Sequence, residues 1–173
     1  MQINMHIHRC ICIDIWSGLY KGIPMATLCT CSKLRQLSRK ITGIYDHYLA
    51  ENEISIGQYS LLSKINRAGS VGMIPLADEM GMDRSTLSRT LKPMIAAGWI
   101  ETLDLPLAAQ QSKRSFGVKL TEKGQQKRGE CQPNWLKAQN YIDEMLGLEL
   151  HQQLFNVLDQ ANNDLAKEDA HHE

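Results

Sequence analysis

Apolar residues recur at steps of three and four along much of the chain, and this spacing is typical of amphipathic helices. One such stripe runs from Leu34 to Tyr48, and another runs from Leu150 to Leu165. Apolar residues make up 43% of the chain and aromatic residues only 6%, so an aliphatic core is expected. The pattern therefore predicts a mainly helical protein, and the composition excludes a chain that is disordered over most of its length.

No stretch of the sequence reaches the ~20 consecutive apolar residues that a membrane-spanning helix needs. The chain has five cysteines, and because this number is odd they do not form a framework of paired disulfides. The start of the chain also lacks the pattern of a cleavable secretion signal. We therefore expect a soluble, cytoplasmic protein with reduced thiols and no membrane partner.

Residues 1–24 differ from the rest, because β-branched, histidine and cysteine residues are mixed there without a clear period. The steady helical pattern begins only after Met25, so one hypothesis is that translation naturally starts at Met25. Histidines and cysteines between residues 6 and 12 are possible metal ligands. Their spacing matches no standard zinc pattern, and we predict no metal site and no cofactor.

Residues 74–97 combine a short helical pattern, a tight turn at Gly81 and a second helical pattern. Ala77 is small enough for two helices to cross closely, and Leu87 can pack the second helix against the first. This spacing is typical of a helix-turn-helix. The second helix carries short hydroxyls and long cations that suit DNA phosphates and base edges. These candidate DNA-binding residues are Arg84, Ser85, Thr86, Ser88, Arg89 and Lys92.

Two stretches after this motif are predicted to form β-strands, at residues 99–103 and 115–120. The loop between them ends with Lys113 and Arg114. Such a loop can project beside the second helix and contact the DNA backbone or a narrow minor groove. Lys113 and Arg114 are therefore also candidate DNA-binding residues.

Charged residues are unevenly distributed, although the formal net charge is zero. Residues 64–128 contain 11 basic and 6 acidic residues, whereas residues 129–173 contain 2 basic and 9 acidic residues. An isolated run of cationic residues is usually a solvent-exposed surface without a binding partner. Here the basic segment coincides with the helix-turn-helix and the hairpin, and this agreement favours nucleic acid as its partner.

Three motifs carry a resemblance to a known family: the run from Leu76 to Arg89, the run Gly98-Trp99-Ile100, and the run from Leu120 to Gly124. They resemble the MarR family of winged helix-turn-helix regulators, in order and length from about Cys29 to Leu165. The resemblance implies a mainly α fold with a small wing of two or three strands. It also implies a homodimer on double-stranded DNA, with two lobes that face successive major grooves of a pseudo-palindromic operator.

The resemblance also divides the chain into regions. It implies a helical dimerisation region from residues 25–66 and 121–168, and a winged helix-turn-helix lobe from residues 67–120. Residues 169–173 are expected to form a frayed tail.

We therefore predict a sequence-specific transcriptional regulator that acts as a repressor and is released by an effector or by thiol oxidation. The alternative is a protein-interaction module of the same fold that has lost DNA binding, which the zero net charge favours. An enzyme is not expected, because the sequence has no glycine-rich phosphate loop and no nucleophile motif.

Two features depart from the family pattern. The family wing usually carries an Asp shortly before a pair of Arg residues, whereas Ser112 and Lys113 stand in the matching stretch here. Weaker wing contacts are therefore expected. Pro93 lies inside the second helix of the motif and removes the hydrogen bond to the carbonyl of Arg89, so we expect a kink near Arg89.

Cys29 and Cys31 lie at the predicted start of the first helix, where the helix dipole favours a thiolate. The peroxide-sensing branch of the family uses a thiol near this helix, and some members resolve it with a cysteine of the partner subunit. The resemblance thus implies Cys29 or Cys31 as the oxidised thiol and Cys131 as the resolving thiol. The alternative is that these cysteines are small buried apolar residues.

Other effectors stay open. The family pocket between the dimer base and the lobes often takes small aromatic anions, and Tyr45, His47, Tyr48 or Arg67 are candidates to line it. Each of these side chains also suits packing or a surface position. Zinc bound by His47, Cys29 and Cys31 fits by ligand type, but no spacing supports it.

Overall fold

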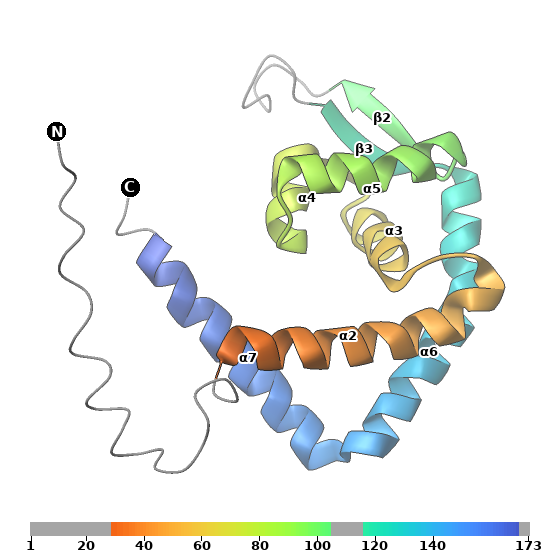
Figure 1. Ribbon diagram of the computed structural model, residues 1–173. Coiled ribbons are helices and arrows are strands. Elements are labelled where there is room, and N and C mark those ends of the chain that lie inside the picture. Colours follow the sequence, from red (N-terminus) through yellow and green to blue (C-terminus); the bar gives the residue numbers. More distant parts are fainter. Residues whose placement is uncertain (1–28, 105–115, 170–173) are drawn as a thin grey trace, which may run out of the picture. The chain divides into compact units, whose positions relative to one another are not determined.

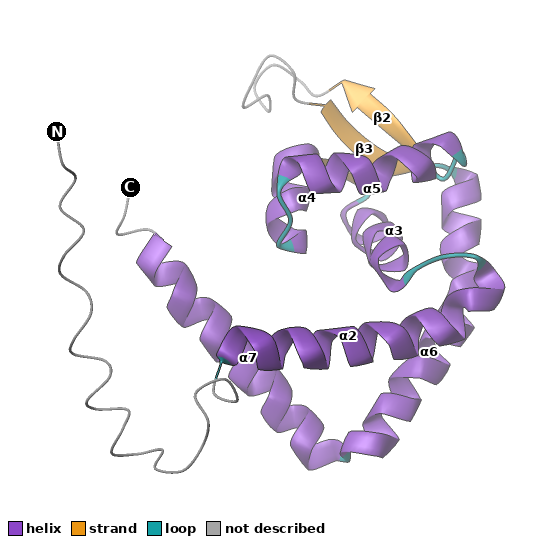
Figure 2. Ribbon diagram, in the orientation of Figure 1, coloured by secondary structure: helices purple, strands orange, loops and turns teal. Residues whose placement is uncertain are grey.

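The computed structural model describes residues 29–104 and 116–169, and the remaining residues, including the predicted extension 1–24, lie outside this range (Figure 1). The helices are α2 (Thr30–Leu49), the 3-10 helix η2 (Ala50–Asn52), α3 (Ile56–Ala68), α4 (Met73–Met80), α5 (Arg84–Ala96), α6 (Glu122–Leu146) and α7 (Leu148–Asp169). The strands are β1 (Ser70–Gly72), β2 (Ile100–Asp104) and β3 (Phe116–Leu120). Helices dominate the described residues, and the expected mainly α fold with a small β wing is confirmed (Figure 2).

The chain forms two compact units, residues 1–40 and residues 41–173. The described part of the first unit is the beginning of α2, where the Cys29 carbonyl accepts a hydrogen bond from the Lys33 amide at 3.1 Å. The second unit contains the end of α2 and every later element.

The sheet is antiparallel, with strand order β1-β3-β2. Val118 on the central strand is opposite Val71 on one side and Thr102 on the other. The two predicted strands are present, each within one residue of the expected start, whereas no residue range was predicted for the third strand, β1. With only three residues, β1 has no periodicity of its own, and it forms because β3 offers an edge with which it can pair.

One hydrophobic core holds α3, α4, α5 and the sheet together. Its fully buried side chains include Leu61, Leu62, Ile65, Leu76, Leu87, Leu91, Met94 and Val118. Three of these residues come from α3, which the predicted boundary at residue 67 assigned to the dimerisation region. In the structure, α3 packs against α4, α5 and β3, and the predicted division into a dimerisation region and a lobe stays a prediction.

The helix α5 is continuous from Arg84 to Ala96 and contains Pro93. The expected kink at Arg89 therefore does not interrupt the helix. Pro93 lies three residues before the C-terminal end of α5, so only a few backbone hydrogen bonds of the helix follow it. Leu91 and Met94, on either side of it, are fully buried in the core and keep this part of α5 in place.

Two helices follow the sheet. Thr121 caps the start of α6, and its hydroxyl accepts a hydrogen bond from the Gly124 amide. At the other end, Gly147 adopts a φ of 74°, which side chains rarely tolerate, and separates α6 from α7. Figure 2 shows this junction as a short loop between two long helices. None of the helices in the described range is long and apolar enough to cross a membrane.

Candidate nucleic-acid interface

The turn between α4 and α5 is set by Gly81, which adopts the left-handed conformation with a φ of 59°. Its amide donates to the Asp78 carbonyl at 3.0 Å, and the Met82 amide donates to the Ala77 carbonyl at 2.9 Å. Ala77 is almost completely buried, and Leu87 packs in the same core. The predicted roles of these residues in a helix-turn-helix are confirmed.

Asp83 caps the N-terminus of α5. Its carboxylate accepts hydrogen bonds from the Ser85 hydroxyl at 2.5 Å, the Thr86 hydroxyl at 2.7 Å and the Thr86 amide at 2.8 Å. These donors, the Ser85 hydroxyl first, hold the pKa of Asp83 well below its usual range. The hydroxyl protons of Ser85 and Thr86 are thus engaged within the cap, which sequence reasoning did not foresee.

The outward face of α5 is cationic. Arg84, Arg89 and Lys92 are exposed, and in the described part of the chain none of them forms an ion pair. Arg89 donates from Nη2 to the Thr86 hydroxyl at 3.1 Å, which orients its guanidinium along the helix. Ser88 is exposed on the same helix. The structure therefore groups the predicted α5 residues on one accessible helix whose opposite side is buried.

The structure describes the strands of the wing but not the loop between β2 and β3. Strands β2 and β3 pair along their length, and Lys119 and Glu101 form an exposed ion pair at 3.0 Å across them. Lys113 and Arg114 lie outside the described residues. Their predicted contact with DNA stays a prediction.

The end of α5 is joined to the start of α6 by close backbone contacts. The Thr121 hydroxyl donates to the Gly98 carbonyl at 2.6 Å, and Lys123 Nζ donates to the Ala97 carbonyl at 2.8 Å. The Thr121 amide donates to the Trp99 carbonyl at 3.1 Å. Two of the motifs noted in the sequence, at residues 98–100 and 120–124, therefore contact each other and hold α6 against the lobe.

The cysteines occupy two different environments. Cys29 and Cys31 are exposed at the beginning of α2, in agreement with their predicted position. Cys131 is completely buried on α6, and burial raises the pKa of its thiol. In the structure, Cys131 packs as a small buried residue in the core, and its predicted resolving role stays a prediction.

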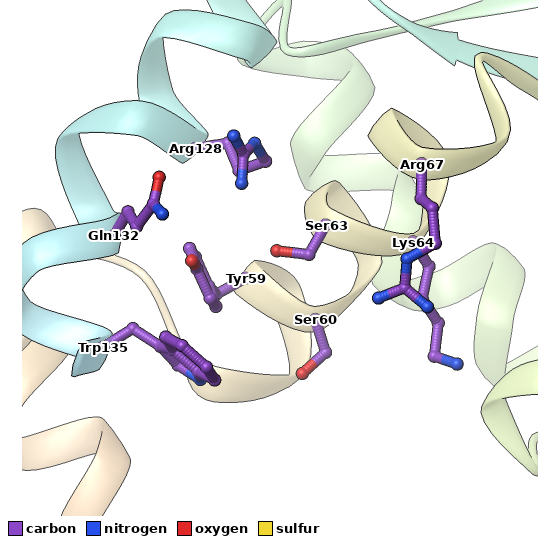
Figure 3. A pocket seen from close by; sticks show the side chains of 8 residues that line it. All are labelled: Tyr59, Ser60, Ser63, Lys64, Arg67, Arg128, Gln132 and Trp135. Carbon is purple, nitrogen blue, oxygen red and sulfur yellow. The ribbon is translucent and has the colours of Figure 1, made fainter. Parts of the chain in front are cut away.

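A pocket of about 330 Å³ lies between α3 and α6 (Figure 3). Arg67 lines it, as considered from the sequence, whereas three other candidates lie elsewhere. The Tyr45 hydroxyl donates to Gln139, and Tyr48 packs against His47 and Tyr141. Among the described residues, no cluster of three or more histidine, cysteine or carboxylate side chains is arranged to hold a metal ion.

The α4–α5 turn, the exposed cationic face of α5 and the adjoining antiparallel strands define a winged helix-turn-helix protein. Residues 54–106 match the sequence model of the MarR family. In this stretch and in its fold, the chain is similar to the MarR family of transcriptional regulators.

Known proteins resemble the chain over most of its length. The multiple antibiotic resistance protein MarR of Escherichia coli (strain K12) is 26% identical over 132 residues, which are 76% of this chain and 78% of the relative. The crystal structure of the M. tuberculosis transcriptional regulator MosR in complex with DNA has a TM-score of 0.64 at 25% identity, and the match covers 78% of this chain and 97% of MosR. AbsC, a MarR family transcriptional regulator from Streptomyces coelicolor, shares the fold with a TM-score of 0.68 at 16% identity, over 86% of this chain and 99% of AbsC.

Proposed function

We propose that the chain is a homodimeric, sequence-specific DNA-binding repressor that acts in the cytoplasm on a pseudo-palindromic operator. The observation that carries this proposal is the exposed face of α5, where Arg84, Arg89 and Lys92 have no acidic partner in the described residues. Cations left unpaired on the second helix of a helix-turn-helix suit phosphate and base contacts in a major groove. The similar regulator MosR has been crystallised with DNA.

The helix α7 supports the dimer. Leu148, Phe155 and Leu165 are 82%, 51% and 64% exposed in the single chain. Several large apolar side chains that are this exposed on one helix usually mark an interface between proteins. A second copy of the chain would cover them, and it would bring a second α5 to the next half-site of a palindromic operator.

The proposed dimer would repress transcription simply by occupying promoter DNA. A dimer that fills two successive major grooves over a promoter excludes other proteins from that DNA, so binding alone is sufficient and no catalytic group is needed. Release requires a signal that the lobe can sense, and we propose two routes. One is a small-molecule effector, and the other is oxidation of Cys29 or Cys31.

The thiol route rests on the exposure of Cys29 and Cys31 at the beginning of α2. A thiolate there would attack an organic hydroperoxide, forming sulfenic acid and releasing the corresponding alcohol. The buried Cys131 would contribute only after local opening of α6.

Fluorescence anisotropy of the full chain on DNA from upstream of its own gene tests the proposal. We expect binding that weakens steeply as the salt concentration rises, because phosphate contacts release counterions. We also expect release after a stoichiometric dose of organic hydroperoxide, recovery with dithiothreitol, and loss of this response in the Cys29→Ser, Cys31→Ser double variant. Salt-independent association, or no association with any promoter DNA, would favour a protein-interaction module instead.

A further inference from the structure

The connection between α2 and α3 contains a strained residue. Glu53, directly after η2, adopts the left-handed conformation with a φ of 52° and a ψ of 41°. In the described part of the chain, it is the one residue other than glycine with a positive φ. Residues with a side chain adopt this conformation rarely, and it persists where surrounding contacts hold the backbone in place.

The contacts that hold this connection come from α6. Lys127 Nζ donates to the Asn52 carbonyl at 2.6 Å, and Asn134 Nδ2 donates to Asn52 Oδ1 at 2.9 Å. Asn52 Nδ2 in turn donates to the Glu130 carbonyl at 3.4 Å. Asn52 is the last residue of η2 and immediately precedes Glu53. Three residues of one helix therefore fix the backbone next to the strained position.

Lys127 also reaches the end of α5. Its Nζ lies over the Trp99 ring, 5.2 Å from the ring centroid, where the negative face of an indole attracts a cation. Trp99 follows shortly after α5, and its amide donates to the Met94 carbonyl of that helix at 3.0 Å. One ammonium group therefore contacts both the connection from α2 to α3 and the turn that ends α5.

The environment of Lys127 suits a bridging role. The side chain is half-buried, and among the described residues it forms no ion pair. An ammonium group has three donors and no acceptor, so it can serve a carbonyl and a ring face together. A lysine that only solvates a helix surface extends its ammonium group into water instead.

Such a bridge matters for a protein that reads two half-sites. The two α5 helices of a dimer fit successive major grooves only when their spacing matches that of the grooves. The apparent affinity for a complete operator is reduced to the fraction of dimers that already have this spacing. The contacts between one α5 and its own half-site do not depend on that fraction.

We propose that Lys127 is a positioning residue for DNA binding, which joins the α2–α3 connection, α6 and the end of α5 and so fixes the spacing between the two α5 helices of a dimer. Lys127 acts through Asn52 and Trp99 and does not itself contact DNA. This inference rests on the proposed function, because the spacing matters only to a dimer that binds two half-sites.

The test compares DNA with two half-sites and DNA with one. Footprinting of the full chain on DNA from upstream of its own gene locates the operator, and the second duplex is the same fragment with one half of the footprint scrambled. Lys127→Met keeps most of the apolar stem and removes the ammonium group. Its affinity for the complete operator should fall about three- to tenfold, the usual effect of losing one hydrogen bond and one exposed cation–π contact. Its affinity for the duplex with one half-site should match that of the wild type.

Two further variants accompany this comparison. Lys127→Arg should restore binding to the complete operator, because a guanidinium group can also donate to the Asn52 carbonyl and lie over Trp99. Gln125→Met, at an exposed position of the same helix, should bind both duplexes as wild type. If Lys127→Met does not fold, Asn134→Ala replaces it and should show the same difference between the duplexes.

A phosphate contact would give a different result. Lys127→Met would then weaken binding to both duplexes equally and lower the salt dependence by about one unit of slope. That result overturns the positioning role. Wild-type affinity of folded Lys127→Met for the complete operator overturns it as well.

Hydrogen exchange of the full chain without DNA tests the bridge itself. The Glu53 amide donates to the Ala50 carbonyl at 2.9 Å, and the Ile56 amide donates to Asp46 Oδ1 at 2.7 Å. Both amides should exchange faster in Lys127→Met, while the amides of α4 exchange as in the wild type. Operator binding with unchanged exchange refutes the positioning role alone. Wild-type protein that binds no promoter DNA refutes the proposed function, and the positioning role with it.

Discussion

Gly124 lies directly against the carbonyl group of Trp99, so closely that a Cβ atom at position 124 would be 1.9 Å from the Trp99 oxygen and 2.8 Å from its carbonyl carbon. Only a residue without a side chain fits between this carbonyl and α6. The contact lies beside the hydrogen bonds from Thr121 and Lys123 to the end of α5. These contacts therefore fix the start of α6 against the end of the helix proposed to read DNA.

Substitution of Gly124 should consequently destabilise the protein. Gly124→Ala places a methyl group against backbone that cannot move aside, and overpacking of this kind costs about 1–3 kcal/mol. Gly129→Ala on the same helix is the matched control, because nothing lies within 4 Å of the added Cβ. The control should be neutral or stabilised by up to about 1 kcal/mol. Urea denaturation of both variants measures the difference, and equal stabilities would contradict the assigned contact.

Arg89→Ala should weaken binding to the specific operator by about 1–3 kcal/mol, the usual contribution of a base-edge contact. The measurement is anisotropy on operator DNA and on random DNA at fixed salt concentration. An equal loss on both would make Arg89 a phosphate contact. Lys137→Ala on α6 serves as the control for lost positive charge, and we expect it to leave operator affinity unchanged.

The exposed apolar residues of α7 predict a change of oligomeric state. The double variant Phe155→Glu, Leu165→Glu places two like charges in the proposed interface, where they would be desolvated without partners. Light scattering after size exclusion should show the mass of a monomer for this variant and of a dimer for the wild type. Gln160→Glu, an exposed polar position on the opposite face of the same helix, should stay dimeric. A wild-type monomer would remove the basis of the dimer proposal.

Cys131 should be inert while the chain is folded. Burial raises the pKa of this thiol, so at pH 7 to 8 it carries less thiolate than an unfolded cysteine, and the thiolate is the reactive form. In a variant whose other cysteines are Ser, Ellman's reagent should react slowly with native protein and rapidly after denaturation. A variant that retains only Cys29 should react rapidly in both states. Fast labelling of native Cys131 would show that α6 opens readily.

Local signals made much of this fold predictable. Asp83 begins α5 and Gly81 sets the turn before it because a capping carboxylate and a left-handed glycine act through residues next to them in sequence. The start of α6 is local in the same way, because Thr121 caps it through the Gly124 amide three residues later. Helical periodicity also located every helix of the motif.

The remaining features depend on residues that are distant in the chain. The strand β1 forms only against β3, and α3 joins the lobe because its apolar face meets the α4–α5 core. Ser63 and Arg128 reach the same pocket from two different helices. No periodicity or motif marks such pairs, so the pocket was approached from the sequence through Arg67 alone.

The Asp83 cap of α5 affects which DNA sequence the protein would prefer. Asp83 keeps a negative charge at the N-terminal end of α5 and occupies the hydroxyl protons of Ser85 and Thr86. The carboxylate makes that end less favourable for a phosphate group, and the two hydroxyls, whose protons are engaged, can only accept hydrogen bonds from a base. Recognition then falls to the guanidinium groups of Arg84 and Arg89, whose best partner in the major groove is guanine. We therefore expect operator half-sites that present guanine to Arg84 and Arg89.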